Sequence, residues 1–461
     1  MFSPKKLPLL IAASLYAIGS QAGGLSDRFE NRMDHRSDRL QIRPQHRLPS
    51  SQGYPAPEAA LGRLLYADEN LSLNRNQSCA SCHSLEPAHD PLTGRKLPSP
   101  GFVDPDNVSN GTVVSAGSEA GRFGRLNAPS VGYAAFSPFF HWNGDEGLYV
   151  GGQFWNGRAN TLADQAGAPF LNPDEMAMPS QWAVVTRLKE NQRYVRLFKK
   201  VYDIDLDLIP AYEQAPANMT PPPGAFAAYD AMATAIGEFE KSRLFNRFDS
   251  KFDFVEAGVI DYTEQEQRGA DLFDTKAQCA ACHVAATIAP DGSDFPALLT
   301  DFTYDNLGVP RNVNIPGNPE PDPGLGGRPD ITEKDPAGNE IGKHKVMSLR
   351  NIEFTPPYMH NGVFETLEQV VHFYNTRDVK PRVCVDNNDP GFGIDCWPEP
   401  EFAATMNVDE LGNLDLTPEE EADIVAYLKT FTDNYPKWGK DPAVPPGTPS
   451  PYADTPFPPL P

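Results

Sequence analysis

Two segments of this chain, residues 79–83 and 279–283, share the pattern C-x-x-C-H, which gives them the clearest chemistry in the sequence. In the attachment pattern of c-type haem, both thiols bond to porphyrin vinyl groups and the histidine reaches the iron. A zinc site needs four protein ligands, and neither segment has a second cysteine pair nearby. A thioredoxin-like redox pair has no need for the histidine. The sequence therefore predicts two covalent c-type haems, held by Cys79, Cys82, His83, Cys279, Cys282 and His283.

The remaining two of the six cysteines, Cys384 and Cys396, lie in a stretch rich in Pro, Gly and Asp at 381–400. In an oxidising compartment, two thiols this close in the chain form a local disulfide that closes a loop. The alternative is that both cysteines remain free thiols. Export of the protein to an oxidising compartment would make this alternative less favourable. We predict the disulfide, without a catalytic role.

The N-terminus has the pattern of a secretory signal peptide. Lys5 and Lys6 precede an apolar segment at 7–20, and Ser20-Gln21-Ala22 fits a small-x-small cleavage site. The apolar segment is short and interrupted for a transmembrane helix, and an uncleaved anchor is the alternative. Because haem is attached to C-x-x-C-H outside the cytoplasm, we expect a periplasmic protein cleaved near Ala22, with no transmembrane helix in the mature chain.

The composition narrows the possible partners. The 461 residues include 62 Asp and Glu against 39 Lys and Arg, a net charge of −23. Binding to nucleic-acid phosphates needs a basic surface, so nucleic acid is excluded as an expected partner. A protein partner would dock through a basic face. The 47 prolines and 36 glycines predict long irregular connections.

Helical apolar spacing recurs along the chain. The predicted helices lie at 57–67, 180–202, 224–245, from a capping Thr263 onward, at 366–376 and at 417–431. One helix leads into each C-x-x-C-H motif, which indicates a weak internal repeat. Loops are expected at 84–153 and 309–330, and no region is strand-rich. The expected fold is mainly α, with two cytochrome-c-like haem domains and long irregular loops.

The domain boundaries follow from this repeat and from the composition of the ends. We expect a signal peptide at 1–22, a polar lead-in at 23–50, an N-terminal haem domain at 51–250, a C-terminal haem domain at 251–435 and a Pro-rich tail at 436–461.

Four longer segments carry a more specific signal. They are RLNAPS at 125–130, the segment 154–176 that begins FWNGRANTLADQ, FTYDNLGVPRN at 302–312, and the segment 349–375 that begins LRNIEFTPPYMHNG. Together with the haem motifs, these segments resemble the bacterial di-haem cytochrome c peroxidase superfamily, and more narrowly its MauG-like branch. The resemblance spans most of residues 55–432.

The resemblance implies that the N-terminal haem is the peroxidatic one, with Gln165, Pro169 and Glu175 in its distal pocket. A peroxidase needs a group that takes a proton from bound H2O2 and returns it to the departing oxygen. Glu175 is the candidate for this acid and base, Gln165 would orient the peroxide, and Pro169 would shape the pocket. Without the resemblance, Glu175 would be interpreted as a solvated surface carboxylate.

The resemblance also assigns the second iron's distal ligand. In ordinary peroxidases this ligand is a Met, fourteen residues after the histidine of a Y-x-H-x-G segment; counting from His360 gives Tyr374, and the MauG-like branch has Tyr there. A phenolate stabilises ferric and higher iron states, whereas a Met would raise the potential. The alternatives are an ordinary core tyrosine at 374 and ligation by Met347, Met359 or Met406.

Further site residues are implied by the resemblance alone. Trp155 matches a family tryptophan that lies between the haems and mediates hole transfer, the movement of an electron vacancy. A calcium ion between the domains would be bound by the Asn127 side chain and by the carbonyl oxygens of Thr355 and Pro357, which are hard ligands of the kind Ca²⁺ prefers.

The chain departs from the family pattern at two places that bear on activation. Residues 141–153 form an insertion relative to shorter members, and the cysteine loop is another. Ordinary members have a distal histidine after the first haem motif; the candidates here are His89, at a shorter spacing, and His141, within the insertion. Both are otherwise interpreted as exposed loop histidines. We predict that the first haem is five-coordinate without reductive activation.

These features predict a periplasmic di-haem peroxidase that uses H2O2 to form a high-valent state shared by two haems. Oxidising equivalents would pass through Trp155 to an electron-donor redox protein, or to a Trp or Tyr side chain of a partner protein. The alternative is a di-haem electron-transfer cytochrome without peroxidase activity, which would require both irons to be six-coordinate.

Overall fold

The computed structural model describes residues 56–87, 96–212, 220–285, 287–288 and 294–455. The predicted signal peptide, the lead-in and His89 lie outside these residues. Helices make up most of the regular structure, and the strands are two or three residues long. Within the described ranges, no helix is both long enough and apolar enough to cross a membrane.

The N-terminal half is built around helix α8, which lies between α2 and α5. Its helices are α2 (Pro57–Tyr66), α3 (Cys79–Cys82), α4 (Pro105–Asn110), α5 (Leu162–Leu171), α6 (Gln181–Lys189), α7 (Gln192–Tyr202) and α8 (Pro223–Glu240). Helix α2 approaches α8 so closely that a Cβ on Gly62 would lie 1.8 Å from the Ala235 carbonyl oxygen. The main core of this half runs from Leu61 to Phe245 in sequence.

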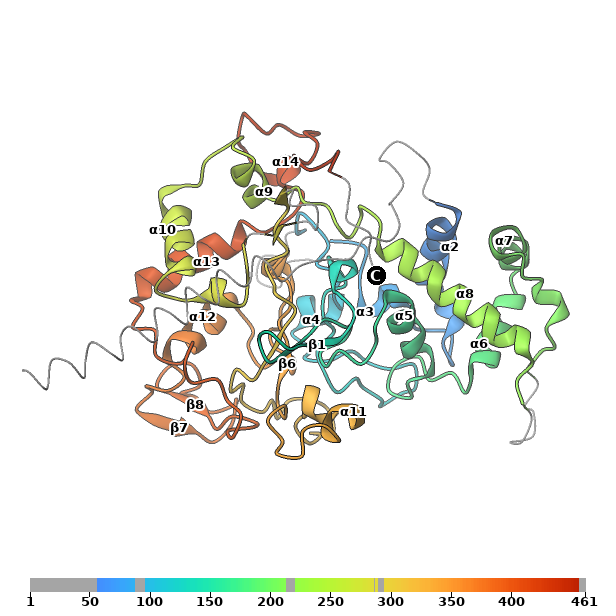
Figure 1. The fold of residues 1–461 in the computed structure, drawn as a ribbon, viewed down its shortest axis with the longest axis horizontal. Coiled ribbons are helices and arrows are strands. Elements are labelled where there is room, and N and C mark those ends of the chain that lie inside the picture. The colour runs from blue at the N-terminus through green and yellow to red at the C-terminus, as the bar shows by residue number, and fades with distance from the viewer. Residues whose placement is uncertain (1–55, 88–95, 213–219, 286, 289–293, 456–461) are drawn as a thin grey trace, which may run out of the picture.

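The C-terminal half is centred on the packing of α10 against α13. Its helices are α9 (Lys251–Glu256), α10 (Glu264–Asp274), α11 (Pro329–Thr332), α12 (Leu367–Thr376), α13 (Pro418–Lys429) and α14 (Tyr435–Trp438). Gly269 permits the α10–α13 contact, because a Cβ there would lie 2.0 Å from the Asp423 carbonyl oxygen. The core runs from Phe252 to Phe431. Figure 1 shows α10, α12 and α13 on one side of the molecule and α2, α6, α7 and α8 on the other.

Strands form four two-stranded sheets among the described residues. The antiparallel pairs are β1 (His141–Asn143) with β2 (Leu148–Val150), β3 (Thr287–Ile288) with β4 (Asp294–Phe295), and β5 (Tyr304–Asp305) with β6 (His344–Lys345); the parallel pair is β7 (Arg382–Cys384) with β8 (Cys396–Pro398). The β1–β2 hairpin pairs His141 with Val150, so most of the inserted segment is a hairpin rather than a loop.

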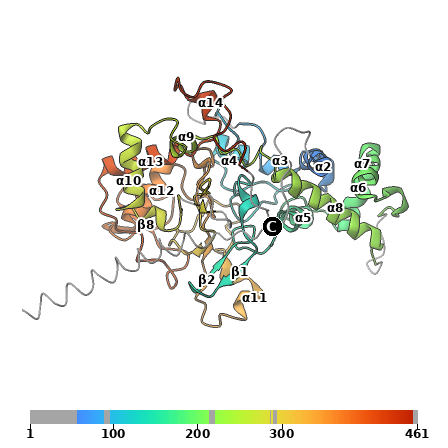
Figure 2. The same cartoon turned by 45° about the horizontal axis from the view of Figure 1, so that its top comes forward.

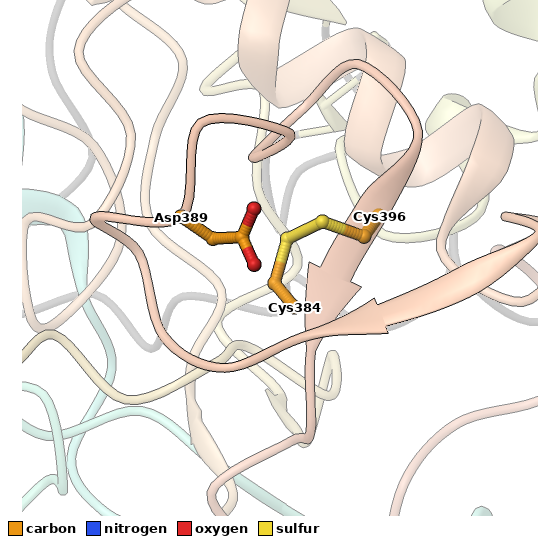
Figure 3. A group of neighbouring side chains, drawn as sticks. All are labelled: Cys384, Asp389 and Cys396. Atoms are coloured by element: carbon orange, nitrogen blue, oxygen red, sulfur yellow. A yellow bond between two sulfur atoms is a disulfide. The ribbon is translucent and has the colours of Figure 1, made fainter.

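The predicted disulfide is present and joins Cys384 of β7 to Cys396 of β8. Figure 3 shows Asp389 beside it, within the loop that the disulfide closes. The Arg382 guanidinium is paired with Asp389 at 2.7 Å and with Asp395 at 3.0 Å. The disulfide closes the loop, and these ion pairs add contacts between β7 and residues within it.

Buried polar contacts join the two halves. The Tyr133 hydroxyl donates to Asp433 at 2.8 Å and accepts from the Phe248 backbone N–H at 2.9 Å. Burial raises the pKa of Asp433 to about 7. Nearby, the fully buried Arg350 donates to Asp253 at 2.7 Å.

The predicted helices are confirmed with changes at their ends. The segment 180–202 divides into α6 and α7, because Asn191 caps α7 through a side-chain bond to the Arg193 N–H. Helix α8 ends at Glu240 rather than at 245. The long loop expected at 84–153 also contains α4. Helix α5 was not predicted; it begins at a capping Thr161 and contains Pro169 in its second half, where a proline cannot donate the helical bond to the Gln165 carbonyl.

Candidate active site

Two cavities lie beside the cysteine motifs. The larger, of about 530 Å³, is lined by Cys79, Cys82 and His83. The smaller, of about 220 Å³, is lined by the corresponding Cys279, Cys282 and His283. Each motif therefore presents both thiols and its imidazole to a single cavity, as attachment to one porphyrin requires.

Each motif histidine is oriented by a backbone carbonyl. His83 Nδ1 lies 3.1 Å from the Phe102 carbonyl oxygen, and His283 Nδ1 lies 3.0 Å from that of Leu299. Donation from Nδ1–H leaves Nε2 as the nitrogen available to a metal, which is the usual arrangement of a ligating histidine. Burial lowers the pKa of His83, which favours the neutral imidazole. None of the four motif cysteines is disulfide-bonded, so their thiols suit thioether bonding.

The larger cavity also contains the three predicted distal residues, Gln165, Pro169 and Glu175. Helix α5 supplies the first two, and Glu175 follows in the turn after it. The Glu175 carboxylate accepts a hydrogen bond from Asn172 Nδ2 at 2.7 Å. Burial raises the pKa of Glu175, while the positive charge of Arg158 and the Asn172 bond oppose the rise. The structure therefore brings a half-buried carboxylate, rather than a fully solvated one, into the cavity of the first motif.

A second histidine could bind a haem iron in the larger cavity only if it lay near enough, and few of the described histidines do. Of them, His83 alone lines this cavity. His141 is exposed on β1, where its Nδ1 lies 2.8 Å from the Phe139 carbonyl oxygen. It does not reach the first motif, and a five-coordinate first haem stays a prediction.

Tyr374 lines the smaller cavity from helix α12. Burial raises the pKa of its phenol, so the free side chain is protonated near neutral pH. Met347 and Met359 line the same cavity, whereas Met406 does not and instead packs against Gly308. The geometry thus keeps Tyr374 and two of the three methionines as possible ligands.

Trp155 lines both cavities. Its indole N–H donates to the Asn127 carbonyl oxygen at 2.9 Å, and its own carbonyl accepts from the Lys345 N–H at 2.8 Å. These contacts fix the ring between the two motif sites, in the position expected of a relay.

The three predicted calcium ligands gather at the same boundary. The Asn127 amide nitrogen lies 2.5 Å from the Pro357 carbonyl oxygen, and Thr355 lines the same cavity. The amide oxygen accepts from Asn107 Nδ2 at 3.1 Å. Exchanging the oxygen and nitrogen of the Asn127 amide, and with them those of Asn107 so that two N–H groups do not face each other, would direct an oxygen towards Pro357. The donor set then consists of hard oxygens, which fit Ca²⁺.

Three buried ionisable residues in these cavities were not predicted. Glu240, which is 3% exposed, lines the larger cavity, and burial raises its pKa to about 8. Burial lowers the pKa of Lys345, which lines both cavities, to about 7. His344 lines the smaller cavity, and its ring stacks on that of His360 with 3.7 Å between centroids. No motif marks these residues; their burial arises from tertiary packing.

Comparison with known proteins agrees with this geometry. A family model for di-haem cytochrome c peroxidase matches residues 56–259. The methylamine utilization protein MauG of Paracoccus denitrificans is 36% identical over 392 residues, which cover 83% of this chain and 91% of that protein. The cytochrome c551 peroxidase of Nitrosomonas europaea is 29% identical over 398 residues, covering 85% of this chain and 84% of the relative.

A solved structure extends the comparison to the fold. The diheme peroxidase BthA from Burkholderia thailandensis superposes with a TM-score of 0.61 at 28% identity, covering 83% of this chain and 87% of that one. The chain belongs to the di-haem cytochrome c peroxidase family, in which it is similar to MauG. It is a haem peroxidase with two haems, an oxidoreductase for which H2O2 is the oxidant.

Proposed function

We propose that this chain binds two covalent c-type haems and uses H2O2 to form a high-valent state shared by both. It then oxidises a partner, either a redox-protein donor or a Trp or Tyr side chain of a protein. The observation that carries the proposal is the placement of Trp155, which lines both cavities, while Glu175 lines only the larger one. This arrangement supports peroxide chemistry at the first site and storage of oxidising power at both.

The distal residues act on peroxide in the larger cavity. The haem iron supplies the coordination site and the electrons. The Glu175 carboxylate takes a proton from the peroxide and returns it to the departing oxygen, and Asn172 holds it in place. Gln165 orients the peroxide by hydrogen bonding, and Pro169 shapes this wall of the cavity.

Tyr374 is proposed as the second iron's distal ligand. Because burial raises its pKa, the phenol would release its proton to solvent only where a strong cation such as ferric iron takes the proton's place on the oxygen. A phenolate favours the ferric and higher states. That preference suits a site that stores oxidising power rather than one that receives electrons at high potential.

The calcium ion is proposed at Asn127, Thr355 and Pro357. It would hold the Trp155 segment against the C-terminal half, since the Asn127 carbonyl accepts the indole N–H. A chelator should therefore slow communication between the haems before it releases either of them.

Location in the periplasm, after cleavage of a signal peptide near Ala22, belongs to the same proposal. It rests on the N-terminal pattern, on the C-x-x-C-H chemistry and on the disulfide, which is characteristic of oxidising compartments.

The test is to add H2O2 to the diferric holoprotein and follow both haems by optical and Mössbauer spectroscopy. The proposal expects a high-spin ferric component at the start, and a long-lived oxidised state at both irons. Rapid turnover only in the presence of a reduced cytochrome would favour simple peroxide removal. Two low-spin haems that do not react with peroxide would instead identify an electron-transfer cytochrome.

A further inference from the structure

A row of aromatic rings runs from the molecular surface towards the Trp155 segment. Trp142 of β1 contacts Tyr149 of β2 with 4.8 Å between ring centroids. Tyr149 stacks on Phe140 at 5.2 Å, and Phe140 meets Tyr304 of β5 edge-on at 5.9 Å. Figure 2 shows the β1–β2 hairpin at an edge of the molecule, beside α11.

The inner end of the row is tied to the segment that holds Trp155. Tyr304 pairs with Lys345 across the β5–β6 ladder, and the Lys345 N–H donates to the Trp155 carbonyl at 2.8 Å. The Tyr304 ring fills the space where Gly157 would carry a side chain. Arg328 adds a second link, because it donates to the Gly157 carbonyl at 2.6 Å while its guanidinium lies 3.8 Å from the centre of the Phe140 ring.

The outer end is an exposed indole. Trp142 is 51% exposed, whereas Trp182 and Trp397 are buried and Trp155 and Trp438 are partly buried. Carboxylates act on Tyr149 at this end: besides burial, the charges of Glu340, Asp330 and Asp335 raise its pKa, while Arg328, which pairs with Asp330, lowers it. Negative charge stabilises an electron vacancy on a nearby ring, and it attracts a basic partner.

The rings of the row differ in whether a nearby group can accept the proton that the ring loses on oxidation. The Tyr304 hydroxyl donates to the Gly151 carbonyl, which cannot accept the proton that an oxidised tyrosine releases. Phe140 has no proton to lose and faces a cation. At Trp142, solvent water can accept the indole proton. A vacancy is therefore disfavoured on Phe140 and Tyr304 and settles at the outer end of the row, where Tyr149 passes it to the exposed Trp142.

We propose that Trp142 is the exit through which oxidising equivalents leave this enzyme for a basic protein partner. The inference rests on the proposed function, which supplies the oxidant. In each step one electron moves inward from Trp142 through the row and Trp155 to the oxidised haem site, and the indole proton passes to water. The partner then donates one electron, and a proton from water restores Trp142. Two such steps consume the two oxidising equivalents of one H2O2.

The first test locates the vacancy. H2O2 is added to the holoprotein with a nitroso spin trap and no reductant, and trapped peptides are identified by mass spectrometry. We expect labelling at Trp142, and a several-fold loss of that labelling in Tyr149→Phe, which keeps the ring but not its ease of oxidation. Labelling of Trp142 that is unchanged in Tyr149→Phe, or absent from the wild type, would overturn the route.

The second test measures how fast oxidising equivalents reach a protein partner. A small basic ferrocytochrome c serves as the protein probe, and Trp142→Phe should lower its oxidation rate several-fold, with the loss reduced at high salt. Trp438→Phe is the matched control, because Trp438 lies outside the row and should leave the rate unchanged. Since Trp142 is on an exposed hairpin, haem content and circular dichroism should match the wild type.

The two proposals fail in different ways. If the wild-type haems do not react with H2O2, the proposed function fails and the route falls with it. If both haems are oxidised as expected but Trp142→Phe oxidises the probe at the wild-type rate, only the route is refuted.

Discussion

Replacing Glu175 by Gln tests the chemistry assigned to the larger cavity. The amide keeps the size of the side chain and can still contact Asn172, but it cannot accept a proton near neutral pH. General acid–base catalysis contributes about 10²–10⁴-fold to a rate. Glu175 is half-buried and is the candidate base of this cavity, so we expect peroxide activation to slow by at least about 10²-fold, or about 2.7 kcal/mol in activation free energy. Both haems should remain bound.

The pH dependence gives a second and independent readout. The base must be ionised, so activation should rise with pH through the pKa of Glu175, which burial raises above its ordinary value of 4.5. Arg158 lowers that pKa by its charge. In a plot of activation rate against pH, Arg158→Met should therefore move the rising limb to higher pH, and Glu175→Gln should abolish that limb.

Stopped-flow spectroscopy at fixed H2O2 concentration measures both effects. Arg122→Met is the matched control: its guanidinium pairs with Asp174 at 3.3 Å, and it is not among the charges that shift the pKa of Glu175. A wild-type activation rate in Glu175→Gln would refute the assignment of the base. A limb that moves equally in Arg158→Met and Arg122→Met would refute the electrostatic reasoning.

Three further outcomes are expected. Tyr374→Phe should shorten the lifetime of the H2O2-oxidised protein, and Tyr374→Met should raise the potential of the second haem; an unchanged second-haem spectrum in both variants would exclude the tyrosine as ligand. Asp253→Asn should lower the free energy of unfolding by about 3–5 kcal/mol, because it leaves the buried Arg350 without its carboxylate, and chemical denaturation measures this. Replacing Cys384 and Cys396 by Ser should lower the same quantity by about 2–4 kcal/mol with peroxide activation unchanged, and an equal loss of activation would show that the loop supports the site.

Local patterns account for much of the helical structure that could be predicted. Thr263 and Thr417 cap α10 and α13 through side-chain bonds to backbone N–H groups, a signal that is readable within four residues. The strands could not be predicted in this way, because pairs of two or three residues are too short to show alternation. Helix α5 was missed because Gly167 and Pro169 lower its apparent helical propensity, while packing against α8 stabilises it.

The candidate site likewise contains residues that could be predicted from the sequence and residues that could not. The haem motifs could be predicted from spacing, and Glu175, Gln165 and Tyr374 from a family resemblance. Contacts between residues far apart in the sequence could not be predicted. An example is the contact between Asn127 and Pro357, which are 230 residues apart. The buried charges of Glu240 and Lys345 were equally hidden, since burial of an ionisable group is decided by the whole fold.

The bond between Tyr133 and Asp433 has a consequence for how the protein is assembled. Tyr133 belongs to the half that carries the first haem motif, yet its acceptor lies 300 residues later, beyond the last long helix. A chain in which the segment around residue 433 has not yet folded leaves the Tyr133 hydroxyl of the first half without its carboxylate. The first half therefore completes its buried hydrogen bonds only when the second half has packed against it.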